Sequence, residues 1–107
     1  MEQHRHYLTT QIAGFSYWEG CIAFNHLRIG TELTLKRESN NKFDPYAVAV
    51  YFGKYKLGFL PRNQNEDISK FLEMGHKDLF EVRVNRKSKD EHPENQVGII
   101  VYIKRKE

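Results

Sequence analysis

The side chains best suited to binding chemistry lie in the polar segment 38–45, which reads ESNNKFDP. Two amides, a cation, an aromatic ring and a carboxylate occupy five consecutive positions, Asn40–Asp44. The asparagines, Asp44 and Pro45 are typical turn residues, because Asx side chains bond to nearby backbone and proline presets φ. Turn geometry does not require Phe43. Loops of this kind between strands are where binding groups sit on a rigid scaffold, so the segment is a candidate binding loop.

Proteins that bind single-stranded nucleic acid use aromatic faces for the bases, cations for the phosphates and polar groups for orientation. The chain offers all three kinds. The aromatic candidates are Tyr17, Trp18, Phe43 and Phe59, the cations are Arg37, Lys42 and Arg62, and the orienting groups are Asn41 and Asp44. Each base stacked on a ring contributes about 1–3 kcal/mol. Three phosphate contacts predict an affinity that falls with added salt, with a slope of about −0.7 per contact.

Asp44 has two competing interpretations. A carboxylate repels phosphates, so a place beside a nucleic-acid groove is unfavourable unless a group there donates a hydrogen bond to it. A free 3′-hydroxyl donates such a bond, and a terminal phosphate does not. In one interpretation Asp44 accepts from the 3′-hydroxyl while Asn41 braces the last nucleotide. In the other, Asp44 caps its own turn through an Asx bond, which the sequence alone explains more simply.

The sequence contains no pattern that supports catalysis. Cys21 and His26 are five positions apart, which does not place them on one face of a helix. Paired-carboxylate motifs and phosphate-binding glycine loops are absent. His4 and His6 have no cysteine or carboxylate pair beside them and make a poor metal site. We expect no enzyme, no metal and no cofactor, with Cys21 as a small core filler.

The composition fits one globular domain. The chain has 107 residues, of which 39% are hydrophobic and 29% charged, with a net charge of +3. This charge permits nucleic-acid binding without demanding it. No apolar segment resembles a signal peptide or approaches the roughly 18 residues of a membrane span. A cytoplasmic protein with no membrane partner is the default expectation.

Apolar patterns predict six strands, over residues 7–15, 31–38, 47–52, 56–60, 80–85 and 97–103. The strand over 47–52 is a continuous apolar run and should be buried on both faces. We expect an all-β, OB-like six-stranded barrel, because closure removes exposed strand edges. The domain should cover residues 7–106, preceded by a disordered tail over residues 1–6. Residues 86–96, polar and with a proline, predict a long mobile loop. Gly58 inside a strand indicates a close backbone approach.

Two helices complete the prediction. A short one is expected over residues 21–27 and a longer one over about 63–74. Asn63 is a suitable N-cap for the longer helix, with Glu66 as its capping-box partner. Ile68, Phe71 and Leu72 recur at helical spacing and form an apolar stripe that should close one end of the barrel.

Three motifs in this order resemble the HIRAN domain: GFSYW (14–18), RESNNKFDPYAVAV (37–50) and LGFLP (57–61). Motifs spread over residues 11–72 are more specific than one short pattern. The chain resembles a stand-alone bacterial-type member, which implies a module similar to the one at the N-terminus of fork-remodelling helicases. That module is an OB-like barrel that binds single-stranded DNA at a free 3′-hydroxyl end.

The resemblance also implies roles for individual residues. Tyr17 and Phe43 look like the pair that sandwiches the terminal base, and Asn41 and Asp44 like the pair that binds the hydroxyl. Phe59, with Arg62, is similar to the groups along the following nucleotide and phosphate. The resemblance thus favours the interpretation in which Asp44 binds the 3′-hydroxyl over the one in which it only makes an Asx bond. It further implies a place in DNA repair or replication-fork processing, with a separate helicase or nuclease chain as partner.

A protein-interaction module is the alternative from another functional class. Barrels with a groove of exposed aromatics also bind peptides, and Tyr17, Trp18 and Phe59 suffice for such a groove without any cation. DNA binding should weaken as salt rises and should depend on the chemistry of the strand end. Peptide binding should be indifferent to that end.

Overall fold

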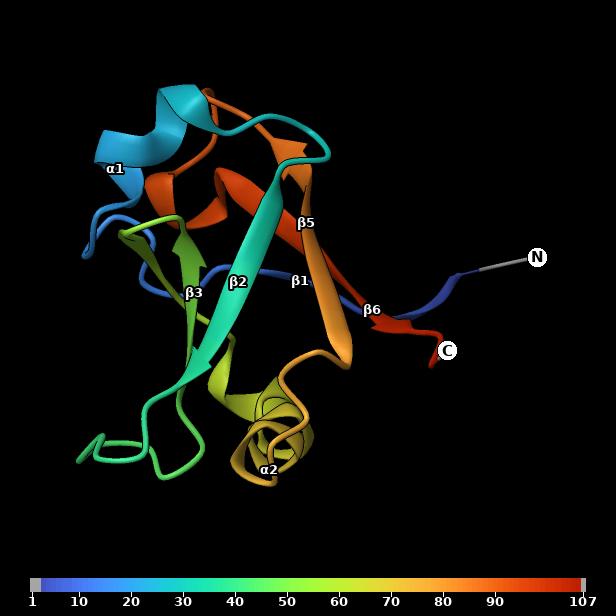
Figure 1. Ribbon diagram of the computed structural model, residues 1–107. Helices are drawn as coiled ribbons and strands as arrows, with labels where there is room; N and C mark the ends of the chain where they lie inside the picture. Colours follow the sequence, from blue (N-terminus) through green and yellow to red (C-terminus); the bar gives the residue numbers. More distant parts are fainter. Residues whose placement is uncertain (1–2, 107) are drawn as a thin grey trace.

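The computed structural model describes residues 3–106, which form a six-stranded antiparallel sheet with a few short helices (Figure 1). The strand order is β1-β6-β5-β2-β3-β4. The strands are β1 (His4–Gln11), β2 (Glu32–Arg37), β3 (Val48–Phe52), β4 (Tyr55–Phe59), β5 (Phe80–Lys87) and β6 (Val97–Lys104). The helices are α1 (Gly20–Ala23) and α2 (Glu66–Glu73), with 3₁₀ turns η1 (Phe24–His26), η2 (Arg62–Gln64) and η3 (Pro93–Asn95).

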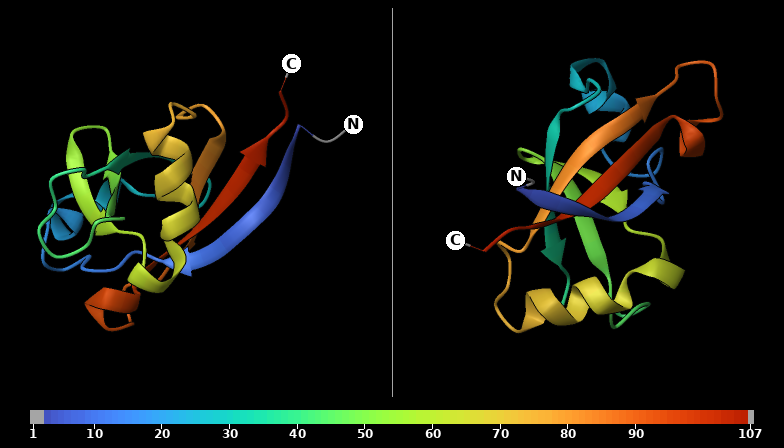
Figure 2. Two further views of the ribbon diagram at one scale, coloured as in Figure 1. Left: turned by 90° about the horizontal axis from the view of Figure 1, so that it is seen from below. Right: turned by 90° about the vertical axis from the view of Figure 1, so that its right-hand side faces the viewer.

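The core lies on one face of the strongly bent sheet and follows the alternation read from the sequence. Val82 and Val84 of β5 and Ile99 and Val101 of β6 are buried and point to the same side. The helices α1 and α2 lie at opposite ends of the sheet, and β1 and β6, the first and last strands, run side by side (Figures 1 and 2). Within residues 3–106 no helix is long and apolar enough to cross a bilayer.

The sheet is not closed, so the expected barrel is not confirmed. Its outermost strands, β1 and β4, share no ladder; only an isolated bridge between Ala13, just beyond β1, and Phe59 of β4 links these two ends of the sheet. Ala13 N donates to Phe59 O over 2.8 Å, and Phe59 N donates to Ala13 O over 2.9 Å. The bridge fixes residues 13–18 against β4, where the candidate rings lie.

Gly58 permits this bridge. Its φ is +148°, and a Cβ atom at this position would lie 2.3 Å from Ala13 O. Only glycine accepts such a contact. The predicted close approach at Gly58 is confirmed.

The longer helix begins later than predicted. The helix α2 starts at Glu66, with Asn65 at the N-cap position, whereas Asn63 lies in η2. No side chain caps the helix, and the Nδ2 atom of Asn65 donates to Asp44 instead. Ile68 is fully buried and Leu72 packs on the core, as predicted, and Phe71 is partly exposed.

The N-terminal tail is ordered from His4, so the prediction of a disordered tail is wrong for residues 4–6. His4 pairs with Lys104 at the end of β6, and its ring stacks on Tyr102 with centroids 3.8 Å apart. Residues 1–2 lie outside the described residues. Cys21 is exposed on α1 rather than filling the core. The loop before β6 is shorter than expected, because β5 continues to Lys87.

Candidate nucleic-acid interface

A groove of about 640 Å³ lies where the segment after β1, the loop between β2 and β3, and the end of β4 meet. Seven of the nine predicted binding residues line it: Tyr17, Trp18, Asn41, Phe43, Asp44, Phe59 and Arg62. Ala13, Gly14, Glu38, Ala47 and Leu60 complete the lining. Residues far apart in the sequence are therefore brought to one surface.

Three rings form one wall of the groove. Trp18 contacts Tyr17 and Phe59 edge to face, with centroids 5.2 Å and 5.8 Å apart. A tight turn, in which Tyr17 N donates to Gly14 O over 3.0 Å, directs Tyr17 outward. Tyr17 is 80% exposed, and Phe43, which lines the groove from the β2–β3 loop, is 85% exposed. Two rings on separate, anchored loops thus present free faces to the same groove.

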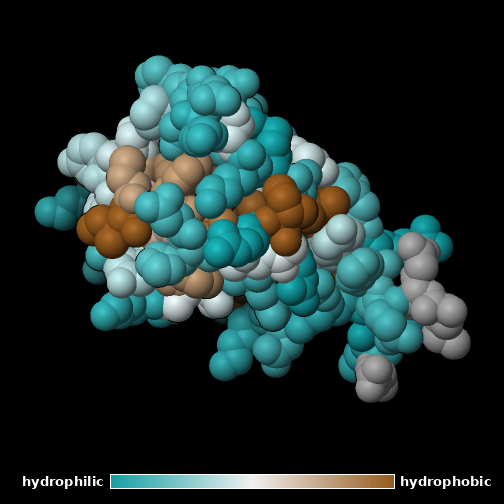
Figure 3. Space-filling view, turned by 90° about the horizontal axis from the view of Figure 1, so that it is seen from above, coloured by the Kyte–Doolittle hydropathy of each residue, from teal (hydrophilic) through white to brown (hydrophobic). Residues whose placement is uncertain are grey.

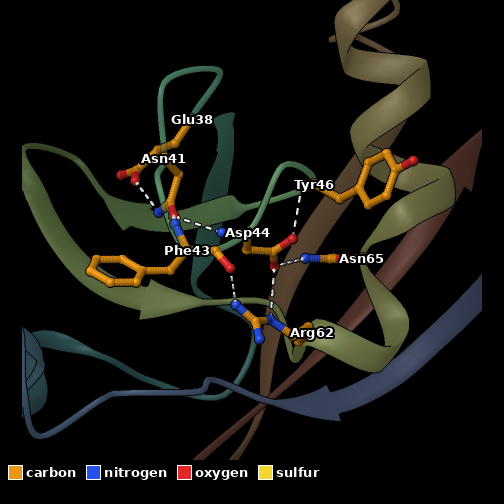
Figure 4. Close-up of polar contacts among 7 residues, drawn as sticks. All are labelled: Glu38, Asn41, Phe43, Asp44, Tyr46, Arg62 and Asn65. Carbon is orange, nitrogen blue, oxygen red and sulfur yellow. Dashed lines mark hydrogen bonds and ion pairs between the residues drawn. The ribbon is translucent and has the colours of Figure 1, made fainter.

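Asn41 shapes the loop that carries Phe43 (Figure 4). Its Oδ1 atom accepts hydrogen bonds from the backbone N–H groups of Phe43, at 2.8 Å, and Asp44, at 3.0 Å. Its Nδ2 atom donates to Glu38 Oε1 over 3.1 Å. Asn41 therefore positions Phe43 through the backbone.

Asp44 makes the Asx bond that the simpler of its two interpretations predicted. Its Oδ1 atom accepts from Tyr46 N over 2.9 Å, and its Oδ2 atom accepts from Asn65 Nδ2 over 2.8 Å. Arg62 Nε lies 3.7 Å from Oδ2, and Arg62 Nη2 donates to Phe43 O. The carboxylate points toward Asn65 and Arg62 while the Phe43 ring points away from this cluster (Figure 4). With 15% of its side chain exposed, Asp44 is first a structural residue.

A family model described as HIRAN domain matches residues 6–106. The chain belongs to the HIRAN domain family. HIRAN domains are generally associated with DNA binding. No curated protein matches the chain.

Two solved structures share the HIRAN fold seen here. A protein from Lactobacillus plantarum superposes with a TM-score of 0.77 at 22% identity, covering 94% of each chain. The HIRAN domain of human HLTF superposes with a TM-score of 0.62 at 17% identity, covering 91% of this chain and 75% of that one. At these identities the likeness concerns the fold.

Two of the predicted cations lie outside the groove lining of this HIRAN domain. Arg37 turns toward α2, where its Nε atom donates to Ser69 Oγ over 3.1 Å and its Nη2 atom lies 3.6 Å from Glu73. Lys42 is exposed on the loop but does not line the groove. The groove therefore has one lining cation, Arg62, where the sequence suggested three.

Lys56 is a site residue that the sequence reasoning missed. Its ammonium lies 3.8 Å from the centre of the Trp18 ring and 4.5 Å from that of Phe59, and pairs with Glu38 over 2.5 Å. On a regular strand Lys56 and Phe59 would point to opposite faces. The register of β3 with β4 shifts between Val50 and Tyr51, which returns both side chains to one face. Gly58 was the only signal of this irregularity.

Other surface features are separate from the groove. Apolar side chains are visible on the end of the molecule that carries α1 (Figure 3). The exposed apolar residues there include Ile22 and Ile29, at 64% and 65% exposure. Among residues 3–106 no group of three or more histidine, cysteine or acidic side chains is arranged to hold a metal ion.

Proposed function

We propose that this HIRAN domain binds the 3′ end of single-stranded DNA in the aromatic groove, with the terminal base between Tyr17 and Phe43. The observation that carries the proposal is the exposure of these two rings, 80% and 85%, on the lining of one groove. Rings in a core have their faces covered, whereas these leave theirs open to water. A flat base that stacks on them removes apolar surface from water and gains about 1–3 kcal/mol per base.

The wall behind Tyr17 supports a second nucleotide. Trp18 and Phe59 are held by their edge-to-face contact and by the ammonium of Lys56. Because these groups are already ordered, binding costs little side-chain entropy. Arg62 is 69% exposed and lies beside Phe43 and Asp44, so it can pair with the phosphate next to the terminal sugar.

We assign recognition of the free hydroxyl to Asp44, in addition to its structural role. A carboxylate has about four lone-pair sites. The contacts of Asp44 with Tyr46, Asn65 and Arg62 leave acceptor capacity on Oδ1. A 3′-hydroxyl can donate to that oxygen, whereas a 3′-phosphate would bring like charge against Asp44 and Glu38, both in the groove lining.

We further propose that the domain works as a binding module rather than an enzyme. In DNA repair or fork processing it would hold a strand end for a separate helicase or nuclease chain. The groove lining contains no cysteine, serine or histidine, and its two carboxylates are engaged, Glu38 by Asn41 and Lys56 and Asp44 by Tyr46, Asn65 and Arg62, which supports a binding role.

A peptide groove is the second candidate, because the lining is nearly neutral. Glu38 and Asp44 oppose the single lining cation Arg62, with Lys56 offsetting Glu38 from behind the rings. Such a balance is weak for a polyanion and suits an extended peptide with apolar side chains.

Fluorescence anisotropy with 5′-labelled oligonucleotides that differ only at the 3′ terminus separates these candidates. We expect tighter binding of the hydroxyl end than of the phosphate end, and we expect Asp44→Asn to reduce the preference, because it removes one of the two carboxylates that repel a terminal phosphate. Asparagine keeps an oxygen for the Asx bond, and the Asn65 amide can turn to accept from the new NH₂ group, so the loop should persist. Equal affinity for both ends would refute end recognition, and absence of binding to either would leave the peptide groove as the better account.

A further inference from the structure

The outer face of β2, β3 and β4 continues the groove surface. In the strand register Phe59 of β4 lies opposite Ala49, and Ala49 lies opposite Lys36 of β2. Side chains directly opposite one another on paired strands point to the same face. Lys36 therefore shares the face of Phe59, two strand spacings away, or about 10 Å between backbones.

The next row of the same face connects the two residues. Tyr51 lies opposite Lys56 in the register and opposite Thr34 on the other side. The Lys36 ammonium lies 4.7 Å from the centre of the Tyr51 ring. The ammonium of Lys56, the neighbour of Tyr51, already touches Trp18 and Phe59. Rings and ammonium groups thus follow one another on this face from the groove to Lys36, with Lys56 and Tyr51 as neighbours in the strand register.

Lys56 and Lys36, the two lysines described on this face, differ in their charge partners. Lys56 is paired with Glu38 over 2.5 Å, and its charge is largely neutralised. Lys36 takes part in none of the ion pairs found among residues 3–106; its contact is the face of Tyr51. A ring holds an ammonium in place without cancelling its charge. Lys36 is therefore the cation on this face that is free to take a phosphate.

We propose that a bound strand leaves the groove over the outer face of β2–β4 and places an internal phosphate on Lys36, which Tyr51 positions. This inference rests on the proposed function and extends it from the terminal nucleotides to the strand behind them. It gives the domain a second subsite, electrostatic in nature, that only strands longer than a dinucleotide reach. The site is built from side chains that the groove itself does not use.

The test measures affinity for two single strands, a dinucleotide and an octanucleotide, both with a free 3′-hydroxyl. A longer strand also offers more binding positions, so length alone does not decide the matter. Lys36→Gln should weaken octanucleotide binding about threefold at low salt and reduce its salt slope by about 0.7, because one phosphate contact is lost. Dinucleotide binding should not change.

Two further variants define the role of each residue. Tyr51→Leu should reproduce the effect of Lys36→Gln, and Tyr51→Phe should restore wild-type binding, because either ring can hold the ammonium. Lys89→Gln, which removes the same charge from the loop between β5 and β6, should leave both affinities unchanged. Circular dichroism melts verify that each variant is folded.

The outcomes are distinct. Selective loss of octanucleotide binding in Lys36→Gln supports the second subsite. If Lys36→Gln behaves like Lys89→Gln while the dinucleotide binds, the second subsite is refuted and the groove proposal stands. If neither strand binds the unmodified protein, the proposed function fails and this subsite fails with it.

Discussion

Asn65 donates a hydrogen bond of 2.8 Å from Nδ2 to Oδ2 of Asp44, and in doing so joins the start of α2 to the groove loop (Figure 4). Asn65 is only 2% exposed, so its amide has little access to water. The side chain of Asn65, at the N-cap position of α2, thus bonds to the groove loop and makes no cap hydrogen bond to the helix. The start of α2 and the loop between β2 and β3 are therefore one structural unit.

Asn65→Asp should strongly destabilise the domain. The change places a second carboxylate against Asp44 in a covered position and costs about 3 kcal/mol of unfolding free energy near neutral pH. Protonation of one carboxyl relieves the repulsion, so part of the loss should be recovered as the pH falls toward 4. Urea unfolding at both pH values measures this.

Asn63→Asp is the matched control for that variant. Asn63 is exposed in η2, and the same chemical change there should alter stability by no more than about 0.5 kcal/mol. If the two variants were equally stable, Asn65 would not be the anchor of the groove loop.

Tyr17→Ala and Phe43→Ala should each weaken binding of a short single strand tenfold or more, as about 1–3 kcal/mol of stacking is lost. Both rings are largely exposed, so melting temperatures should barely change. Ile29→Ala, which truncates an apolar residue of 65% exposure outside the groove lining, is the control and should bind normally. A large fall in the melting temperature of Tyr17→Ala would show that the ring belongs to the core.

Arg62 and Arg37 provide a matched pair for the cation assignment. Arg62→Gln should weaken DNA binding and reduce the salt slope by about 0.7, since it removes the lining cation. Arg37→Gln should leave DNA binding intact and cost about 1 kcal/mol of stability through the lost contacts with Ser69 and Glu73. The reverse pattern would place the phosphate path along α2 instead.

Local patterns predicted most of the fold and of the groove. Strand positions follow alternation, which survives because one face of the sheet is buried. The turn residues of segment 38–45 predicted a shaped loop, and Asn41 and Asp44 do make Asx bonds there. The three family motifs contain the four aromatic residues that line the groove. These signals depend on near neighbours in the chain, which a sequence displays directly.

Contacts between distant segments explain what the sequence missed. Arg37 was assigned to phosphate because its charge is visible, whereas its partners Ser69 and Glu73 lie on a helix more than thirty positions away. Lys56 was overlooked because an irregular register reversed its face. The bond between Asn65 and Asp44 was missed because the two residues are 21 positions apart and only the folded chain brings them together.

Glu81 should make stability sensitive to acid. A hydrogen bond from Arg83 Nε, at 2.9 Å, is the main cause that lowers the pKa of Glu81, and His4 adds to it. A carboxyl with a lowered folded pKa stabilises the protein above its unfolded pKa of about 4.3 and loses that contribution as the pH falls through the folded pKa.

Glu81→Gln measures this contribution. In urea unfolding the variant should be less stable than the parent at pH 6 by up to about 1 kcal/mol, and the difference should shrink toward pH 3. Glu32→Gln, which removes a more exposed partner of the same arginine, is the control for the loss of a charge near Arg83. A difference independent of pH would contradict the assignment.

Trp18 offers the most direct test, because it is the one tryptophan in the chain and it lines the groove. Single-stranded DNA with a free 3′-hydroxyl should change tryptophan fluorescence saturably, with the same midpoint as anisotropy, and Phe43→Ala should shift both midpoints together. If anisotropy shows that DNA binds while the fluorescence emission of Trp18 stays constant, the strand lies outside the groove and the account is contradicted.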